Sequence, residues 1–270
     1  MKKVIVPIIA GVVIILVVIG ISLIPKDRKD QVREVTVKAD TSWIAEAESA
    51  KENGNFLQAK ELYKAAKAEA SSVNELTKIQ KQIEEINMAI IFSSRKDECS
   101  QNYKVKPNDA LSKIAKKFNT TVGLLKRANG LKSDTIIPGQ KLKVSTCKFL
   151  IVVDKSQNIL SLIREGETIK TYVVSTGKDS STPVGNFKII NKLKNPTWYK
   201  TGAVISPESP ENILGTRWMG FDLKGYGIHG TTQPDKLGIQ ITLGCVRMKN
   251  EEVEELYDIV PSGAEVTIVD

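Results

Sequence analysis

Apolar and polar positions follow several distinct patterns along the chain, and the first is an uninterrupted apolar run near the N-terminus. Val4–Ile24 contains 21 residues without a charge, which is enough to cross about 30 Å of hydrocarbon at about 1.5 Å per residue. The run predicts a signal anchor over residues 1–25, a single-pass membrane helix with Lys2 and Lys3 in the cytoplasm and the rest outside. A cleaved signal peptide is the alternative, although its apolar region is normally only about 7–15 residues long.

A helical pattern follows a polar linker over residues 26–42. Within residues 43–95, apolar side chains recur every three or four positions in three stripes, separated at Gly54-Asn55 and Ser71-Ser72. The stretch from Gly54 to Ala66 resembles the second half of a tetratricopeptide repeat, without a second copy. One such unit cannot bury its own apolar face, so we interpret the region as an α-helical hairpin. It is either a spacer or docking surface, or a groove for a protein partner.

The pattern changes again in residues 99–147. Alternating positions at Tyr103 and Val105 precede two stripes of helical period, and a second alternating segment follows at Leu142 and Val144. A switch from the period of a strand to that of a helix and back is typical of a β-α-α-β unit. The sequence therefore predicts a small βααβ module here.

Residues 148–270 contain short apolar segments punctuated by glycine and proline, which is typical of a mainly-β domain. One helix, Glu251–Ile259, is expected within it. The expected strands are Phe149–Val153, Ile159–Ile163, Thr168–Val174, Phe187–Ile190, Gly227–His229 and Val266–Val269. The predicted fold class is therefore multidomain: a transmembrane helix, a helical hairpin, a βααβ module and a mainly-β C-terminal domain.

The βααβ module resembles a LysM domain over its whole length. Asn108 stands where that family usually has glycine, and asparagine also tolerates a left-handed turn. The matching residues are Tyr103, Val105, Asp109, Leu111, Ile114, Ala115, Phe118, Asn129, Pro138, Gly139, Gln140 and Leu142. The resemblance implies a peptidoglycan-binding module whose sugar lies between two loops; a LysM-like fold that binds nothing tightly is the alternative. The implied glycan contacts are Asn108, Asp109, Ala110, Leu111, Leu131, Ser133, Asp134 and Ile136.

The charge of the chain is concentrated in the same module. The chain has 39 Lys and Arg against 31 Asp and Glu, a formal net charge of +8. Residues 101–147 alone hold ten basic and two acidic side chains, whereas residues 148–270 hold 14 and 15. An excess of this kind favours an anionic partner. Because the module is expected outside the cytoplasm, we expect cell-wall material rather than nucleic acid.

The chain has three cysteines, so at least one has no partner within it. Cys99 and Cys147 lie just outside the two expected strands of the module, which pair and bring the ends of the segment together. Three pairings are formally possible, and this placement favours Cys99 with Cys147. Closing a loop of 48 residues would stabilise the fold by about 2–4 kcal/mol, and Cys245 would remain free.

Cys245 and the single histidine, His229, are 16 residues apart in the mainly-β domain. On neighbouring strands they could come within hydrogen-bond reach, where an imidazole can generate the nucleophilic thiolate. A lone cysteine is, however, often a buried small hydrophobe, and a lone histidine is often structural. With one histidine and no cluster of further ligands, a metal site is disfavoured, and no cofactor is expected.

The residues around the pair carry a more specific signal. His229-Gly230-Thr231 followed by Thr242-x-Gly244-Cys245-Val246-Arg247-Met248 resembles the catalytic signature of the L,D-transpeptidases, the YkuD-like domain. Upstream segments match as well, so that the resemblance covers essentially all of residues 148–270. They are Val152-Val153-Asp154 with Asn158 and Leu160, Ser175-Thr176-Gly177, and Thr182-Pro183-Val184-Gly185 with Phe187.

The resemblance implies roles for individual residues. Cys245 corresponds to the nucleophile and His229 to the general base and acid. The backbone carbonyl of Gly230 would orient the imidazole, and the backbone N–H groups of Gly244 and Cys245 would stabilise the oxyanion.

Further residues are expected around the substrate. Arg247 would hold a substrate carboxylate or the site's own loop, with a structural salt bridge as the alternative. Thr242 fits the family's Ser/Thr position, and Leu243 replaces a histidine often found there. Tyr226 and Trp218 are candidate walls of the substrate pocket, with core packing as the alternative.

The implied enzyme is an L,D-transpeptidase anchored in the bacterial membrane, with its catalytic domain outside the cytoplasm. It would attack a peptidoglycan tetrapeptide stem, release D-alanine through a thioester and pass the acyl group to an amine. Transfer to water instead would make it an L,D-carboxypeptidase. A non-catalytic LysM scaffold that only binds the wall is the third hypothesis.

Overall fold

The structure, a computed structural model, describes residues 41–200 and 202–270. The expected signal anchor and nearly all of the expected linker lie outside these residues. Within the described part of the chain, no helix is both long enough and apolar enough to span a membrane.

The helical region contains three helices, not the two of the predicted hairpin. They are α1 (Thr41–Glu52), α2 (Phe56–Glu69) and α3 (Val73–Ile91). The two breaks in the pattern are the two turns, and Ser72 caps α3 by accepting a hydrogen bond from the Glu75 N–H. The third apolar stripe, which follows the second break, belongs to a separate helix, α3. All three helices share one apolar core, which includes Ala47, Tyr63 and Ile86.

The βααβ module has the expected element order. It consists of β1 (Ser100–Lys104), α4 (Leu111–Lys117), α5 (Val122–Ala128) and β2 (Lys141–Ser145). The two strands are antiparallel, with Tyr103 opposite Leu142. Cys99 and Cys147 are joined by a disulfide bond just outside the paired strands. The apolar stripes of both helices face the sheet and form a separate small core.

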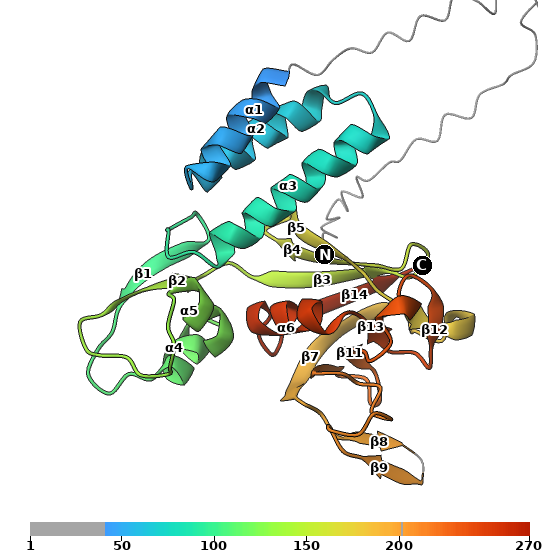
Figure 1. The fold of residues 1–270 in the computed structure, drawn as a ribbon. Helices are drawn as coiled ribbons and strands as arrows, with labels where there is room; N and C mark the ends of the chain where they lie inside the picture. The colour runs from blue at the N-terminus through green and yellow to red at the C-terminus, as the bar shows by residue number, and fades with distance from the viewer. Residues whose placement is uncertain (1–40, 201) are drawn as a thin grey trace, which may run out of the picture. The chain divides into compact units, whose positions relative to one another are not determined.

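The C-terminal domain is built on an eight-stranded sheet in the order β13-β11-β10-β7-β14-β3-β4-β5 (Figure 1). Its strands are β3 (Phe149–Asp154), β4 (Ile159–Arg164), β5 (Glu167–Val173), β7 (Gly185–Lys194), β10 (Arg217–Phe221), β11 (Gly227–His229), β13 (Val246–Arg247) and β14 (Glu265–Val269). Helix α6 (Asn250–Ile259) buries Val253, Leu256 and Ile259 in the main core of the domain.

Smaller elements complete the domain. Strand β6 (Thr176–Gly177) pairs with β12 (Gln240–Thr242), and β8 (Trp198–Lys200) pairs with β9 (Ala203–Ile205). Two 3-10 turns, η1 (Lys178–Ser180) and η2 (Pro234–Lys236), lie in the connections.

Helix α3 covers the outer strand β5 of the sheet (Figure 1). The Asn87 side chain donates a hydrogen bond of 3.1 Å to the Ile169 carbonyl of β5. Thr171 on the same strand donates to the Glu84 carboxylate at 2.6 Å, and Met88 joins the core of the domain. An edge strand exposes unpaired backbone groups, so α3 protects one end of the sheet.

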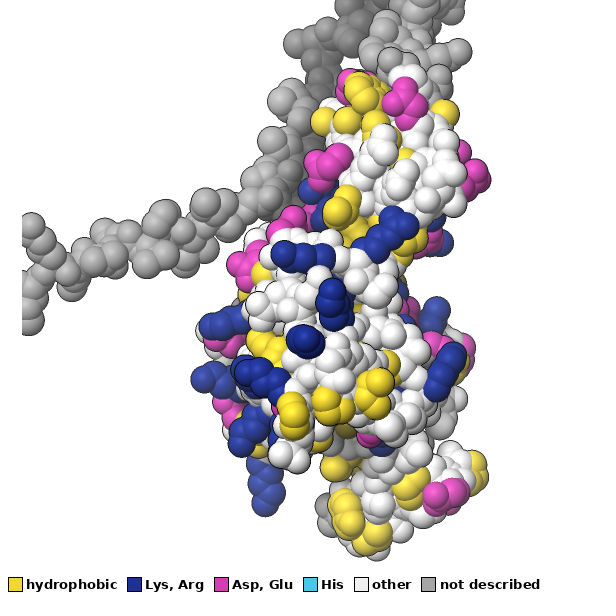
Figure 2. All heavy atoms as spheres, turned by 90° about the vertical axis from the view of Figure 1, so that its left-hand side faces the viewer, with side chains coloured by type: hydrophobic (Ala, Val, Ile, Leu, Met, Phe, Trp, Pro, Cys, Tyr) yellow, Lys and Arg dark blue, Asp and Glu magenta, His cyan; other side chains and the backbone are white. Residues whose placement is uncertain are grey.

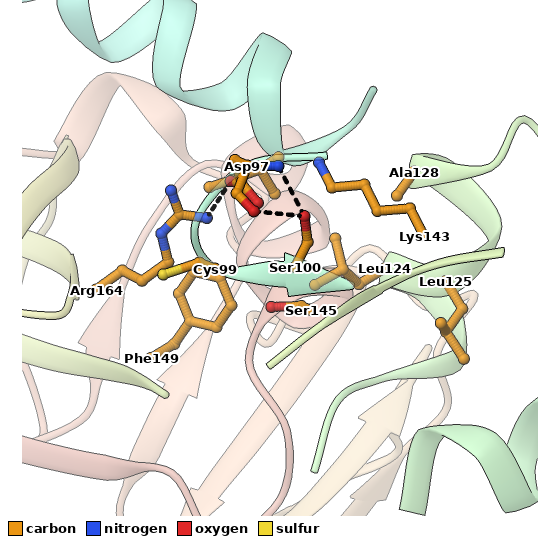
Figure 3. A pocket seen from close by; sticks show the side chains of 11 residues that line it. Asp97, Cys99, Ser100, Leu124, Leu125, Ala128, Lys143, Ser145, Phe149 and Arg164 are labelled. Atoms are coloured by element: carbon orange, nitrogen blue, oxygen red, sulfur yellow. Dashed lines mark hydrogen bonds and ion pairs between the residues drawn. The ribbon is translucent and has the colours of Figure 1, made fainter. Parts of the chain in front are cut away.

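The βααβ module also packs directly on the C-terminal domain. Leu124 and Ala128 of α5 belong to the same apolar cluster as the sheet and α6, and the Thr121 hydroxyl donates to the Asp258 carbonyl. Figure 3 shows the junction, where Arg164 of β4 forms a buried ion pair of 3.0 Å with Asp97. The cavity there is only about 10 Å³, so the junction is closely packed.

Candidate active site

Strands β11 and β13 bring the chain segments of His229 and Cys245 side by side. The two strands are parallel, with Ile228 opposite Val246 and His229 opposite Arg247. Ile228 and Val246 are fully buried in the core. Because successive side chains of a strand alternate between its faces, His229 and Arg247 lie on the opposite face. Cys245 lies in the bend immediately before β13, and its thiol donates a hydrogen bond of 3.5 Å to the Gly225 carbonyl just ahead of β11.

The His229 imidazole is held from two sides. Its Nδ1 lies 2.6 Å from the Gly230 carbonyl oxygen, which accepts the Nδ1 proton and leaves Nε2 as the basic nitrogen. Trp218, its cross-strand partner on β10, stacks on the ring with centroids 6.0 Å apart and an interplanar angle of 20°. Asn191 accepts a hydrogen bond of 3.0 Å from the Trp218 indole N–H, so the stacked indole is itself anchored.

Burial keeps both members of the pair uncharged. Burial lowers the pKa of His229 to about 4, and backbone hydrogen bonds to Gly230 and Leu214 only partly oppose this effect. Burial also raises the pKa of Cys245 to about 11, although hydrogen bonding with Gly227 and the charge of Arg247 both act to lower it. At neutral pH the resting site therefore contains a thiol and a neutral imidazole rather than a thiolate–imidazolium pair.

The turn before the cysteine depends on glycine. Gly244 has a φ of +128°, and a Cβ there would lie 2.6 Å from the Tyr226 ring. The Gly244 N–H donates to the Thr242 hydroxyl at 3.1 Å, and that hydroxyl donates to the Cys245 carbonyl at 2.7 Å. In this conformation the Gly244 N–H is therefore not available to an oxyanion, contrary to the expectation.

Thr242 differs from its expected place at the substrate, whereas the role of Tyr226 as a pocket wall stays a prediction. Thr242 is 4% exposed and its hydroxyl is used within the turn, so it shapes the nucleophile loop rather than facing substrate. Tyr226 packs against the main core and against Gly244. Leu243 is 91% exposed beside them.

Arg247 has a buried side chain next to the reactive pair. Its backbone forms a bridge with Ser175 in both directions, with hydrogen bonds of 2.8 and 2.9 Å. Among the described residues no carboxylate lies within ion-pair distance of its guanidinium, and its Nε is buried without a hydrogen-bond partner. The alternative of a structural salt bridge is therefore wrong for this residue in the described structure. A buried unpaired cation favours an anionic ligand.

The residues expected to bind glycan lie in two surface loops, with one exception. Asn108 has a φ of +64°, and Asp109 accepts hydrogen bonds from the Tyr103 hydroxyl and the Lys106 N–H. Leu111 is 2% exposed in the core of the module, so its side chain packs helix α4 and cannot contact a sugar. Ala110, Leu131 and Ile136 are half-buried, and Ser133 and Asp134 are exposed. Figure 2 shows Lys and Arg side chains gathered over the face that holds this module.

No sequence motif predicts the roles of three asparagines near the site. Asn191 anchors Trp218, Asn212 donates to the Pro196 and Ser206 carbonyls ahead of Leu214, and Asn250 accepts from two backbone N–H groups. Each bonds to groups at least 16 residues away, besides the nearer Ser206 carbonyl at Asn212, and none has a local pattern that predicts it. The described residues contain no group of three or more His, Cys, Asp or Glu side chains suited to a metal ion.

Comparison with known proteins agrees with this geometry. A model of the L,D-transpeptidase catalytic domain (YkuD) matches residues 148–268. The YqjB protein of Bacillus subtilis, assigned by name to the L,D-transpeptidases, is 41% identical over 126 residues, which are 44% of this chain and 70% of YqjB. The chain belongs to the L,D-transpeptidase family. A LysM model matches residues 103–145 of this L,D-transpeptidase.

Two further proteins are similar to this chain over other shares of its length. The YkuD protein of Bacillus licheniformis, named in the same family, is 34% identical over 174 residues, covering 62% of this L,D-transpeptidase and 97% of the relative. The crystal structure of an L,D-transpeptidase from Mycobacterium tuberculosis matches with 17% identity and a TM-score of 0.40, over 50% of this chain and 63% of that one.

Proposed function

We propose that this L,D-transpeptidase cross-links peptidoglycan by acyl transfer through a thioester on Cys245. The donor is a tetrapeptide stem, and the bond broken joins its third residue to the terminal D-alanine. The observation that carries the proposal is the 2.6 Å contact between His229 Nδ1 and the Gly230 carbonyl. It keeps Nε2 basic, as a base for the Cys245 thiol must be.

The first half-reaction begins from an uncharged pair. Because the thiol and the imidazole are both neutral at rest, His229 Nε2 takes the thiol proton as the sulfur attacks the stem carbonyl. The imidazolium is stabilised by the Gly230 carbonyl. When the tetrahedral intermediate collapses, the carbon–nitrogen bond breaks, the imidazolium protonates the departing D-alanine amine, and the thioester remains.

Two groups support the developing negative charge. The Cys245 N–H is the oxyanion donor implied by the family signature; Gly244 would join it only if its N–H left the Thr242 hydroxyl. Arg247 provides a buried cation without a carboxylate partner among the described residues. We assign it to the stem carboxylate or to the oxyanion, because a guanidinium suits a planar anion.

The second half-reaction decides between two activities. An amine from a neighbouring stem would attack the thioester carbonyl, lose its proton to His229 and leave a cross-link, with the thiol restored. Water in place of the amine would make the chain an L,D-carboxypeptidase.

Product analysis distinguishes the candidate functions. The purified chain is incubated with tetrapeptide muropeptides, and the products are separated by mass. Cross-linked dimers together with free D-alanine are the expected result. Tripeptide products without dimers would establish the carboxypeptidase instead, and unchanged tetrapeptide would favour the non-catalytic scaffold.

The LysM module and the apolar N-terminal run support a location at the wall. We assign the module to glycan strands and Val4–Ile24, with its 21 uncharged residues, to membrane anchoring. The ten basic side chains among residues 101–147 would add attraction for anionic wall polymers.

This electrostatic contribution predicts a dependence on salt. Binding of the chain to purified cell walls should weaken steeply as sodium chloride rises from about 0.05 to 0.5 M. Over that range the distance at which exposed charges attract each other becomes shorter, because salt screens them. A sedimentation assay with the Cys245→Ala variant measures binding without turnover. Binding that is constant over the series would contradict the role given to the basic residues.

A further inference from the structure

Asn250 holds the peptide unit that orients the catalytic histidine. It is the first residue of α6, and its Oδ1 accepts a hydrogen bond of 3.1 Å from the Thr231 N–H. The Gly230 carbonyl and the Thr231 N–H belong to the same peptide unit, whose planarity makes them point in opposite directions. The carbonyl meets His229 Nδ1 at 2.6 Å. Asn250 therefore accepts a hydrogen bond from the N–H of this peptide unit, while His229 donates one to its carbonyl.

The same oxygen also reaches the second backbone segment beside the imidazole. Asn250 Oδ1 accepts a hydrogen bond of 3.1 Å from the Thr216 N–H. Thr216 ends the segment that contains Leu214, whose backbone acts to raise the pKa of the imidazole. A single side-chain oxygen thus links the segments on both sides of the histidine, one before β10 and one after β11.

The packing leaves little room for another arrangement. A Cβ added at Gly230 or at Gly215 would overlap Asn250 Oδ1, so both glycines are needed for the approach of this side chain. The Gly230 N–H is bonded to the Arg217 carbonyl at 3.2 Å. Rotation of the Gly230–Thr231 peptide unit would break the Asn250 hydrogen bond and remove the carbonyl from Nδ1 together.

We propose that Asn250 is a positioning residue of this enzyme. By accepting from the Thr231 N–H it fixes the direction of the Gly230 carbonyl, and through it the tautomer of His229. Accepting at the N–H end also polarises the peptide unit and strengthens its carbonyl as an acceptor. The assignment rests on the proposed role of His229 as base, but the state of the imidazole can be observed without any substrate.

The decisive experiment is nitrogen NMR of the imidazole. The chain has one histidine, so its ring signals in a ¹⁵N-labelled sample need no assignment among residues. The wild-type chain is expected to carry its proton on Nδ1. Asn250→Ala should give a mixture with the Nε2–H tautomer, because no side chain then accepts from the Thr231 N–H to fix the direction of the carbonyl. Asn250→Asp keeps an acceptor oxygen at the same position and should restore the Nδ1–H form.

Kinetics of D-alanine release provide the second readout. Asn250→Ala should lower kcat about 10–100-fold, in the range expected when a catalytic group is misplaced by an ångström, with KM changed less than about twofold. Asn250→Asp should recover most of kcat and move the acid limb of the pH profile upward, since its charge favours the imidazolium. Glu251→Ala, at the adjacent exposed position of α6, should match the wild type.

Each outcome decides the assignment. An unchanged imidazole spectrum in folded Asn250→Ala would overturn it, even if the variant were less stable. Should Asn250→Ala not fold, Asn250→Asp alone decides: an imidazole pKa equal to that of the wild type would contradict the proposed proximity. If the spectra change as expected while no variant or wild type releases D-alanine, the positioning role stands and the proposed reaction fails.

Discussion

Replacing Cys245 with alanine is expected to lower D-alanine release from tetrapeptide muropeptides by at least about 10⁴-fold, as removal of a nucleophile does in comparable acyl-transfer sites. Cys245 is the free cysteine of the chain, since Cys99 and Cys147 form the disulfide. The measurement is the initial rate of release at saturating substrate, compared with the wild-type chain.

Two controls separate loss of chemistry from loss of structure. Cys245→Ser preserves the shape of the side chain but replaces the thiol by a far less acidic hydroxyl, and it should be almost as inactive. Both variants should retain the binding to purified walls that we assign to the LysM module. Turnover by Cys245→Ala within tenfold of the wild type would show that another group forms the acyl-enzyme.

Replacing His229 with alanine is expected to slow acylation about 10²–10⁴-fold, the usual contribution of a general base. The pH dependence should change as well. Burial holds the pKa of His229 at about 4, so the base form exists above that pH and the wild-type rate should fall only near it, well below the ordinary histidine value. In the variant, acylation depends on thiolate that forms when Cys245 ionises without the help of a base. The thiolate fraction rises about tenfold per pH unit below the thiol pKa.

The two profiles are measured as second-order rate constants for acylation by a carbapenem, followed by intact-protein mass. A nearly level wild-type profile between about pH 5 and 8 is expected from the neutral pair, and a profile that climbs with pH is expected for His229→Ala. Thiolate absorbance at 240 nm provides an independent check, because a thiol of pKa about 11 should be silent at pH 7. A thiolate signal at pH 5 would show a preformed ion pair instead.

Strands whose apolar residues alternate could be predicted from the sequence. Strand β3 alternates buried and half-buried positions over Phe149–Asp154, and β14 does so within Glu265–Val269. Strand β10 could not be predicted, because Arg217–Phe221 contains a glycine and has three consecutive buried residues at its end. Its pairing with β7 extends β7 to Lys194, through a polar stretch that has no strand pattern of its own.

The packing of α3 on the sheet also depends on contacts that no local pattern reveals. Its apolar stripe predicts one buried face, but Glu84 and Asn87 on the helix are buried too. Both find partners on β5, more than 80 residues later in the chain, and Glu84 also accepts from Gln80 on α3 itself. The face of α3 nearest β5 is therefore occupied, and the role of this region as a spacer or docking surface stays a prediction.

The reactive pair could be predicted from the sequence, but the residues that position it could not. Cys245 and His229 lie in a dense local signature, whereas Asn250 acts through backbone groups of Thr216 and Thr231. The roles of Thr242 and Leu111 were misjudged for the same reason: a motif gives residue identity, while burial and hydrogen bonding decide which way a side chain points. Arg247 illustrates the converse, since its lack of a carboxylate partner among the described residues became visible only in the structure.

The most direct test of the thioester on Cys245 is to trap it. The wild-type chain is mixed with a tetrapeptide muropeptide, quenched in acid within the first turnover and digested for mass spectrometry. We expect the peptide containing Cys245 to gain the mass of the muropeptide acyl group without its D-alanine, and hydroxylamine to remove that mass. Release of D-alanine with no adduct on Cys245, or with the adduct on another residue, would contradict the mechanism.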